Sequence, residues 1–184
     1  MLEIAIHGLG GQGVVTLSSL LAQTAFAAGW QAQAFPSFGP ERTGSPVAAY
    51  VRLSRQPITT RSQIIKPDLI VILDDLPAML SIAMQAGKIL TAHKKPLIII
   101  NSSKTPQELK LNYKKLKIIN ASEALKNLPA KALNSYMLGV ILRTTEIATL
   151  AQAQAAIKNI FTSKDAKLIA ANLTALKLGY ATNR

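Results

Sequence analysis

The sequence predicts an α/β domain of three layers with a mostly parallel sheet. Short apolar runs recur along the 184 residues, and segments with helical periodicity alternate with them. Loops rich in glycine and proline separate the two kinds of segment. This alternation is typical of a parallel sheet with helices on both faces, a Rossmann-like arrangement. The length suits one unit of ordinary size, so we expect residues 1–184 to fold as a single domain.

The first elements are a strand, a helix and a second strand. Residues 2–7 form a short apolar run that ends at a glycine cluster, which predicts a strand. Apolar residues recur at helical spacing over 12–28, and Gly29 is placed to end that helix. Residues 31–35 alternate polar and apolar side chains before Pro36, which predicts the second strand. Together they predict a βαβ unit with a right-handed crossover.

The rest of the chain repeats this alternation after a loop at 36–46 that is rich in proline and glycine. Apolar runs predict further strands at 47–53, 67–75 and 95–103, with a shorter edge strand at 116–120. Helical patterning predicts helices at 76–86, 121–127, 132–147, 149–161 and 164–178.

Composition excludes several kinds of site. There is no cysteine, which excludes disulfides, thiolate metal sites and cysteine-ligated iron–sulfur clusters in this chain. Two histidines are too few for a histidine-based metal site without carboxylate help, so we expect no metal site. The N-terminus lacks the features of a signal peptide, and no apolar stretch is long enough to span a bilayer. We therefore expect a cytoplasmic protein without a membrane partner.

The chain is strongly basic, with a net charge of +12. A basic chain attracts acidic partners such as nucleic acid, phosphorylated cofactors or an acidic protein. Four lysines gather at Lys110, Lys114, Lys115 and Lys117. Such runs are usually no more than a solvated surface. A nucleic-acid-binding domain remains an alternative that rests on charge alone, since no recognition motif accompanies it.

A glycine loop follows the first predicted strand and opens the first predicted helix. It consists of Gly8, Leu9, Gly10, Gly11, Gln12 and Gly13. Glycines permit positive φ and a close approach to the backbone, and the amides at a helix start favour an anion. This arrangement indicates a site for a phosphate group. The alternative is that the glycines only permit a tight turn between strand and helix.

The residues after the second strand argue against a dinucleotide in this loop. Such sites need an acidic residue there to hold the ribose hydroxyls. The second strand instead ends in Phe35, Pro36, Ser37 and Phe38, and the first carboxylate is Glu41, inside the following loop. A stand-alone NAD(P)-binding oxidoreductase therefore remains the weaker alternative. No lysine closes the glycine run as in a Walker loop, and no Ser/His/Asp set is readable.

A second loop, residues 35–47, carries the segment Gly-Pro-Glu-Arg-Thr-Gly-Ser-Pro. Together with the glycine loop it resembles the gamma subunit of 2-oxoacid:ferredoxin oxidoreductases, and its form is most like the pyruvate enzymes. The strand that ends in Arg52 and later matches at Asn134, Asn172 and Gly179 extend the resemblance over nearly the whole chain. Many members have a basic residue where this chain has His7 or Thr43, which puts anion contacts from those two positions in doubt.

The resemblance implies a subunit of an enzyme that converts a 2-oxoacid to its acyl-CoA and passes electrons to ferredoxin or flavodoxin. It implies that thiamine diphosphate, magnesium and iron–sulfur clusters lie on alpha-, beta- and delta-type partner subunits. It implies that this chain binds no cofactor alone, has no catalytic residue and shares coenzyme A with its partners. The cofactor-binding residues that it implies are Gly8, Gly10, Gly11, Gln12, Gly13, Gly39, Glu41, Arg42, Thr43, Gly44 and Arg52.

Alternatives remain open for the charged residues near these loops. Glu41 and Arg42 either face an active site across a subunit boundary or pair with each other. Arg52 either joins them or is simply exposed. His7 either touches a phosphate or, as we favour, is satisfied within the fold. Asp74 and Asp75 either bind a metal or, as we favour, cap the helix that follows.

Overall fold

A computed structural model describes residues 1–37, 44–82, 95–129, 132–162 and 165–182. Within these ranges six strands form one sheet in the order β2-β3-β1-β4-β5-β6. The strands are β1 (Leu2–Leu9), β2 (Gln31–Ser37), β3 (Pro46–Ser54), β4 (Leu69–Ile72), β5 (Leu97–Asn101) and β6 (Leu116–Ile119). The helices are α1 (Val14–Ala27), α3 (Ala121–Ala124), α4 (Leu133–Thr145), α5 (Leu150–Ile160) and α6 (Ala166–Ala181), and residues 77–82 are also helical.

The sheet is mostly parallel, as the sequence predicts, but one strand runs the other way. β1, β4, β5 and β6 are parallel neighbours. β3 is antiparallel to both β1 and β2 and lies between them, so the two strands of the predicted βαβ unit are not adjacent. The physical reason is the short connection from β2 to β3, since a parallel neighbour needs a crossover of about a dozen residues or more.

Most predicted elements are present with shifted ends. The predicted strands at 67–75 and 95–103 shorten to β4 and β5, and the predicted helix at 121–127 shortens to α3. The helix predicted for 164–178 extends to Ala181. Of the helix predicted for 76–86, residues 77–82 are helical and the remainder lies outside the described residues.

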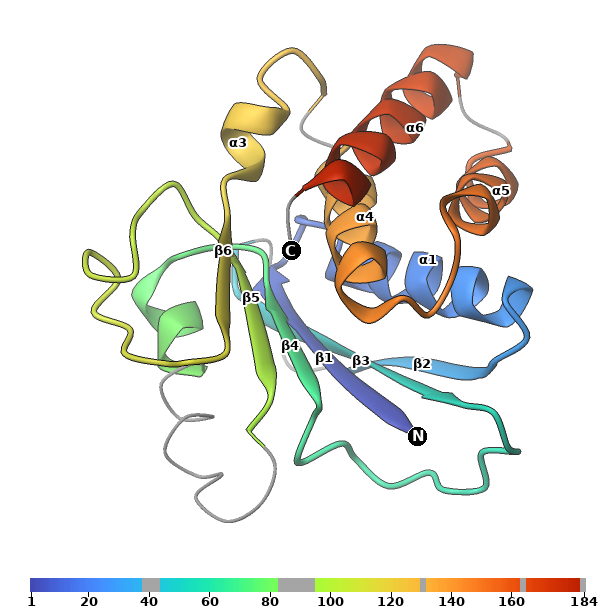
Figure 1. The fold of residues 1–184 in the computed structure, drawn as a ribbon, viewed down its shortest axis with the longest axis horizontal. Helices are drawn as coiled ribbons and strands as arrows, with labels where there is room; N and C mark the ends of the chain where they lie inside the picture. The colour runs from blue at the N-terminus through green and yellow to red at the C-terminus, as the bar shows by residue number, and fades with distance from the viewer. Residues whose placement is uncertain (38–43, 83–94, 130–131, 163–164, 183–184) are drawn as a thin grey trace.

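The two faces of the sheet are covered unequally. Figure 1 shows α1, α4, α5 and α6 together on one face, where the larger core forms around residues such as Ile4, Leu21 and Met137. On the opposite face, residues 77–82 and the segment before β6 pack over β4 and β5 in a smaller core. That core contains Ile70, Ile72, Met79, Ile98, Ile100, Leu109 and Leu111. The three expected layers are therefore present, with one thin outer layer.

Glycines let α4 and α6 approach each other closely. A Cβ atom on Gly179 would lie 2.0 Å from the carbonyl oxygen of Tyr136, and one on Gly139 would lie 2.3 Å from that of Leu176. A buried hydrogen bond from Ser135 Oγ to Asn172 Oδ1 (2.7 Å) joins the same two helices. These later matches to the family pattern are packing residues. None of the described helices is long and apolar enough to cross a membrane.

Candidate functional site

The glycine loop joins the end of β1, Leu9, to the start of α1, Val14, at the carboxyl edge of the parallel strands. Two of its glycines have positive φ, with Gly11 at 93° and Gly13 at 78°. The Gln12 amide donates to the Leu9 carbonyl at 3.0 Å, which closes a tight turn. L-residues with side chains rarely adopt this backbone, so the loop depends on glycine at both positions.

In the described part of the chain, the first turn of α1 presents backbone amides without an acceptor. The first backbone hydrogen bond of the helix runs from Leu17 N–H to the Gly13 carbonyl at 2.9 Å. The amides of Val14, Val15 and Thr16 therefore precede the helical ladder, and no side chain of the described residues caps the helix. Such donors, aligned with the helix dipole, favour an anion at this end.

The side chain of Gln12 braces the loop. Its Oε1 atom accepts the Leu9 amide at 2.8 Å, and its Nε2 atom donates to Asp74 Oδ2 at 2.8 Å. Asp74 Oδ1 accepts the Leu76 amide at 3.0 Å, just before residues 77–82 become helical. The side chain of Gln12 thus ties the loop to the end of β4, and the backbone remains the part of the loop that can meet a ligand.

The second loop contacts the first through the backbone. The Gly10 amide donates to the Ser45 carbonyl at 2.8 Å, and the Gly44 amide donates to the Gly10 carbonyl at 3.2 Å. The structure therefore brings Gly44, with φ 85°, next to the glycine loop. The remaining predicted residues of the second loop lie outside the described residues: Gly39, Glu41, Arg42 and Thr43.

Gly8 has a packing role beneath this site. A Cβ atom there would lie 2.9 Å from both Gln12 Oε1 and Val14 Cγ2, and 3.2 Å from Leu73 Cβ. These distances are shorter than real Cβ contacts normally are, so the position admits only glycine without a shift. Glycine at position 8 thus allows the loop to pack closely against the start of α1 and the end of β4.

A buried asparagine lies against the loop from a distant part of the chain. Asn134, in the first turn of α4, is 8% exposed, and its Oδ1 atom has no hydrogen-bond partner among the described residues. Its amide packs on Gly13 so closely that a Cβ atom there would lie 2.1 Å from Nδ2. The starts of α1 and α4 therefore meet at the glycine loop. Sequence analysis identified Asn134 only as a match to the family pattern, because no local pattern indicates this long-range contact.

His7 faces the side of the sheet opposite α1. Its ring meets Tyr50 edge-on, with ring centroids 6.4 Å apart. Burial lowers the pKa of His7 to about 4, so the imidazole is neutral at physiological pH. A neutral ring packed on Tyr50 supplies no positive charge to the glycine loop.

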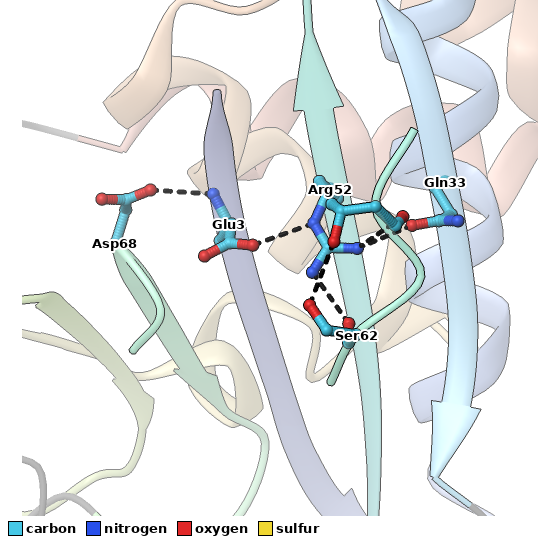
Figure 2. A network of polar contacts seen from close by, with 6 residues as sticks. Glu3, Gln33, Arg52, Ser62 and Asp68 are labelled. Atoms are coloured by element: carbon cyan, nitrogen blue, oxygen red, sulfur yellow. Dashed lines mark hydrogen bonds and ion pairs between the residues drawn. The ribbon is translucent and has the colours of Figure 1, made fainter. Parts of the chain in front are cut away.

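Arg52 lies at the other end of β1, as Figure 2 shows. The β1–β3 register sets Arg52 opposite Glu3, whereas the glycine loop follows Leu9. Its Nε atom donates to Glu3 Oε1 at 2.8 Å, and its guanidinium also donates to Gln33 Oε1 at 2.8 Å and to the Ser62 carbonyl at 3.0 Å. Arg52 is 1% exposed.

The burial of Arg52 corrects the expectation of an exposed side chain. The register places Arg52 away from the glycine loop, and Glu41 and Arg42, which it was expected to join, lie outside the described residues. Its physical role in the described residues is to hold the segment after β3 against β1 and β2 through charge-assisted hydrogen bonds.

Asp75 has its own partners at the ends of β4 and β5. Ser102 Oγ donates to Asp75 Oδ2 at 2.6 Å, and Lys104 Nζ lies 3.3 Å from the same atom. The Ser102 hydrogen bond lowers the pKa of Asp75. Partial burial acts in the opposite direction, and Lys104 lowers the pKa further. Of the residues that the structure describes, no three His, Cys, Asp or Glu side chains gather to hold a metal ion. The favoured expectation of helix capping holds for Asp74, whose carboxylate accepts the Leu76 amide.

Comparison with known proteins identifies the family. Residues 3–182 match the family model described as pyruvate ferredoxin/flavodoxin oxidoreductase. The chain belongs to this family. The match covers both loops, the buried Arg52 and the α4–α6 contact in one alignment, and therefore extends well beyond the glycine motif.

Individual relatives within the pyruvate oxidoreductase family are similar over most of their length. The chain is 37% identical over 170 residues to the pyruvate/ketoisovalerate oxidoreductases common subunit gamma of Pyrococcus abyssi, covering 89% of each chain. It is 37% identical over 164 residues to the pyruvate synthase subunit PorC of Methanocaldococcus jannaschii, covering 89% of this chain and 88% of the relative. The crystal structure of the pyruvate oxidoreductase subunit PORC of Thermotoga maritima superposes with a TM-score of 0.73 at 28% identity, covering 97% and 94% of the two chains.

Family membership decides between the functions that the sequence leaves open. A stand-alone NAD(P)-binding oxidoreductase and a nucleic-acid-binding domain are not supported by any of these similarities. The chain is a non-autonomous part of an oxidoreductase, and its fold is that of the family's gamma-type subunits.

Proposed function

We propose that this chain is the gamma subunit of a pyruvate, or closely related 2-oxoacid, ferredoxin oxidoreductase complex. It folds as a single domain over residues 1–184 and supports oxidative decarboxylation of the 2-oxoacid to its acyl-CoA. The observation that carries this proposal is the family match over residues 3–182. The 37% identity to a subunit named gamma in Pyrococcus abyssi supports the subunit type.

The reaction needs chemistry that this chain's own side chains do not offer. The sequence has no cysteine to ligate an iron–sulfur cluster. Alpha-, beta- and delta-type subunits accordingly hold thiamine diphosphate, magnesium and the clusters, and they pass electrons to ferredoxin or flavodoxin. This chain contributes a binding surface at the glycine loop. Its role is to position a substrate that the partner subunits transform.

That substrate is coenzyme A, which carries three phosphate groups. The observations that support this role are the first-turn amides of α1, the exposed backbone at Gly11 and the buried amide of Asn134 beside Gly13. A helix start of this kind binds phosphate through backbone donors and the helix dipole.

A charge placed in the first turn of α1 tests the coenzyme A site. Val15 is 48% exposed, so Val15→Glu adds a carboxylate at the helix start with little effect on packing. A carboxylate there is favourable for the helix itself but repels an anionic ligand. We expect the KM for coenzyme A of the purified complex to rise about tenfold, which corresponds to about 1.4 kcal/mol, while kcat changes little.

Val15→Gln is the matched control, because it has the same shape and no charge. We expect its KM for coenzyme A to stay within about twofold of that of the unmodified complex. An unchanged KM in Val15→Glu would refute the coenzyme A role and leave the subunit assignment standing. An equal rise of the KM in both variants would show that the shape of the side chain, and not its charge, affects coenzyme A binding at this position.

Native co-purification tests the subunit assignment separately. The tagged full chain, isolated from its own cells under anaerobic conditions, should bring down cysteine-bearing partners that contain thiamine diphosphate and iron–sulfur clusters. The isolated chain should show no 2-oxoacid oxidation, because it has no group to stabilise an acyl carbanion or to store an electron. A chain that purifies alone, or that turns over a 2-oxoacid alone, would overturn the assignment.

A further inference from the structure

The edge strand β6 lies at the opposite side of β4 and β5 from β1, and most of the lysine run of the sequence immediately precedes it. β6 pairs with β5 on one side and, in the described part of the chain, has no strand beyond it (Figure 1). An open strand edge presents unpaired N–H and C=O groups to any chain that can pair with them. This feature plays no part in the function proposed above.

The register shows which backbone groups of β6 are free to pair. The Ile98 amide donates to the Lys115 carbonyl at 2.9 Å, and the Ser102 amide donates to the Ile119 carbonyl at 3.0 Å. Backbone groups of successive strand residues point to opposite edges, so the odd-numbered residues face β5. The N–H and C=O groups of Leu116 and Ile118 consequently point outward, where an added strand can reach them.

A groove of about 830 Å³ runs beside this edge. It is lined by Leu97 and residues 114–119 on one side and by Thr144, Glu146 and Thr182 on the other. Lys114 and Lys115 are exposed, and Lys117 is half-buried. Among the described lining residues, three are lysines and Glu146 is the single acidic residue, so the groove is basic.

We propose that the β6 edge and its groove bind an extended acidic segment of a partner protein, which adds to the sheet as a further strand. Its backbone pairs with the outward groups of Leu116 and Ile118, and its Asp or Glu side chains meet the exposed Lys114 and Lys115. Strand addition of this kind takes affinity from main-chain hydrogen bonds and specificity from alternate side chains. The inference does not depend on the coenzyme A site, and either can fail alone.

Other occupants fit this edge less well. A second copy pairing edge to edge would set lysines against lysines, a repulsion that edge lysines commonly provide against aggregation. A nucleic acid would use the charges but not the outward amides and carbonyls of β6. The groove of about 830 Å³ beside the strand gives an added segment room that an edge guarded by charge alone would not offer.

The test measures binding of a labelled peptide to the full chain by fluorescence anisotropy. The probe is a peptide of about eight residues that alternates Glu with Val. One comparison peptide carries Lys in place of Glu, and another keeps Glu but is N-methylated on the backbone edge that would pair. We expect saturable binding of the acidic peptide, and affinities at least about tenfold weaker for both comparison peptides.

A matched pair of variants locates the binding. Lys114→Glu with Lys115→Glu reverses two exposed groove charges, and Lys158→Glu with Lys167→Glu makes the same change in net charge on exposed parts of α5 and α6. We expect the groove variant to weaken peptide binding about tenfold and the control variant to change it by less than about twofold. Thermal unfolding of both variants checks that each is folded.

Each remaining outcome overturns the proposal. If the methylated peptide binds as tightly as the unmethylated acidic peptide, strand addition is excluded. If the groove variant and the control variant lose the same affinity, the binding depends only on the net charge of the chain. A single-stranded oligonucleotide that displaces the peptide, with affinity lost in the groove variant, assigns the groove to nucleic acid. A dimer of the free chain in light scattering that the groove variant dissociates assigns the edge to a second copy, and absence of saturable binding rejects the site.

Discussion

The two ends of strand β1 carry polar groups in opposite states. At the N-terminal end, Glu3 and Arg52 are joined at 2.8 Å, and the rest of the guanidinium donates to Gln33 and to the Ser62 carbonyl. At the C-terminal end, the first-turn amides of α1 have no backbone acceptor among the described residues, and Asn134 Oδ1 has no partner there. Buried polar groups are nearly always paired, so the buried Asn134 Oδ1 atom indicates a donor that lies outside the described residues.

The difference separates stability from binding on one strand. The guanidinium of Arg52 donates to Glu3, Gln33 and the Ser62 carbonyl at the end of β1 away from the glycine loop, although the family resemblance placed Arg52 among the cofactor-binding residues. The side chain of Gln12 hydrogen-bonds to the Leu9 amide and to Asp74 and does not accept from the first-turn amides of α1, so these amides remain available to a ligand. Substitutions at the first end should therefore change the free energy of unfolding, and charges at the second end should change ligand affinity.

The largest effect is expected from Arg52→Met. The substitution fills much of the same space but leaves Glu3, Gln33 and the Ser62 carbonyl without their donor. Removing one partner of a buried ion pair costs about 3–5 kcal/mol, because the charge left behind, here Glu3 at 23% exposure, is only partly hydrated. We expect the free energy of unfolding in urea to fall by about 4 kcal/mol.

Arg55→Met is the control for this experiment. Arg55 is exposed, stacks over Trp30 with its guanidinium carbon 4.0 Å from the ring centroid, and donates to the Ala28 carbonyl at 3.0 Å. Losing these surface contacts should cost about 1 kcal/mol. If the two substitutions cost the same, the cluster at the start of β1 is not what holds this end together.

A smaller effect, dependent on pH, is expected from His7, which lies between the two ends. Burial lowers the pKa of His7 to about 4, from an ordinary value of 6.5 in the unfolded chain. Above pH 6.5 neither state binds this proton, and the stability is complete. As the pH falls from 6.5 toward 4, His7 becomes protonated in the unfolded chain but stays neutral in the native state. The native state should then lose about 3 kcal/mol.

Comparison with His7→Gln isolates the contribution of His7. The carboxylates titrate in both proteins, so their effect on stability cancels in the difference. Urea unfolding of both proteins at a series of pH values gives the difference in their free energies of unfolding. That difference should be constant above neutral pH and should shift in favour of the variant between pH 6.5 and 4. A difference that stays flat over this window would show that the ring is solvated or protonated in the native state.

Sequence reasoning succeeded where the cause of the structure is local. The apolar runs of β4 and β5 and the spacing of α1 follow from side-chain periodicity, and the turn at Gly11 and Gly13 follows from backbone sterics. The two loops that carry the family resemblance are joined in the structure by the Gly10–Ser45 hydrogen bond.

Sequence reasoning failed where the cause is long-range. The partners of Arg52 come from β1, β2 and the segment after β3, so no window of sequence contains the cluster. The insertion of β3 between β1 and β2 is likewise a property of the whole sheet. Asn134 meets Gly13 only because α4 packs beside α1, and an asparagine at a helix start otherwise looks like an ordinary capping residue.

The smallest effect concerns the glycines of the two touching loops. Gly13 and Gly44 have nearly the same backbone, with φ of 78° and 85°. A Cβ atom on Gly13 would lie 2.1 Å from Asn134 Nδ2, whereas one on Gly44 would meet nothing within 4 Å. We expect Gly44→Ala to cost about 1 kcal/mol for the left-handed backbone alone, and Gly13→Ala to cost about 2 kcal/mol because Asn134 must also move.

The paired variant Asn134→Ala separates backbone strain from the clash. With that amide removed, the cost of Gly13→Ala should fall to that of Gly44→Ala, which a double-mutant cycle of unfolding free energies measures directly. A cost that is the same in both backgrounds would mean that Asn134 does not press on the glycine loop in solution. The amide would then be free to turn away from α1, and the start of that helix would have to hold an anion with backbone donors alone.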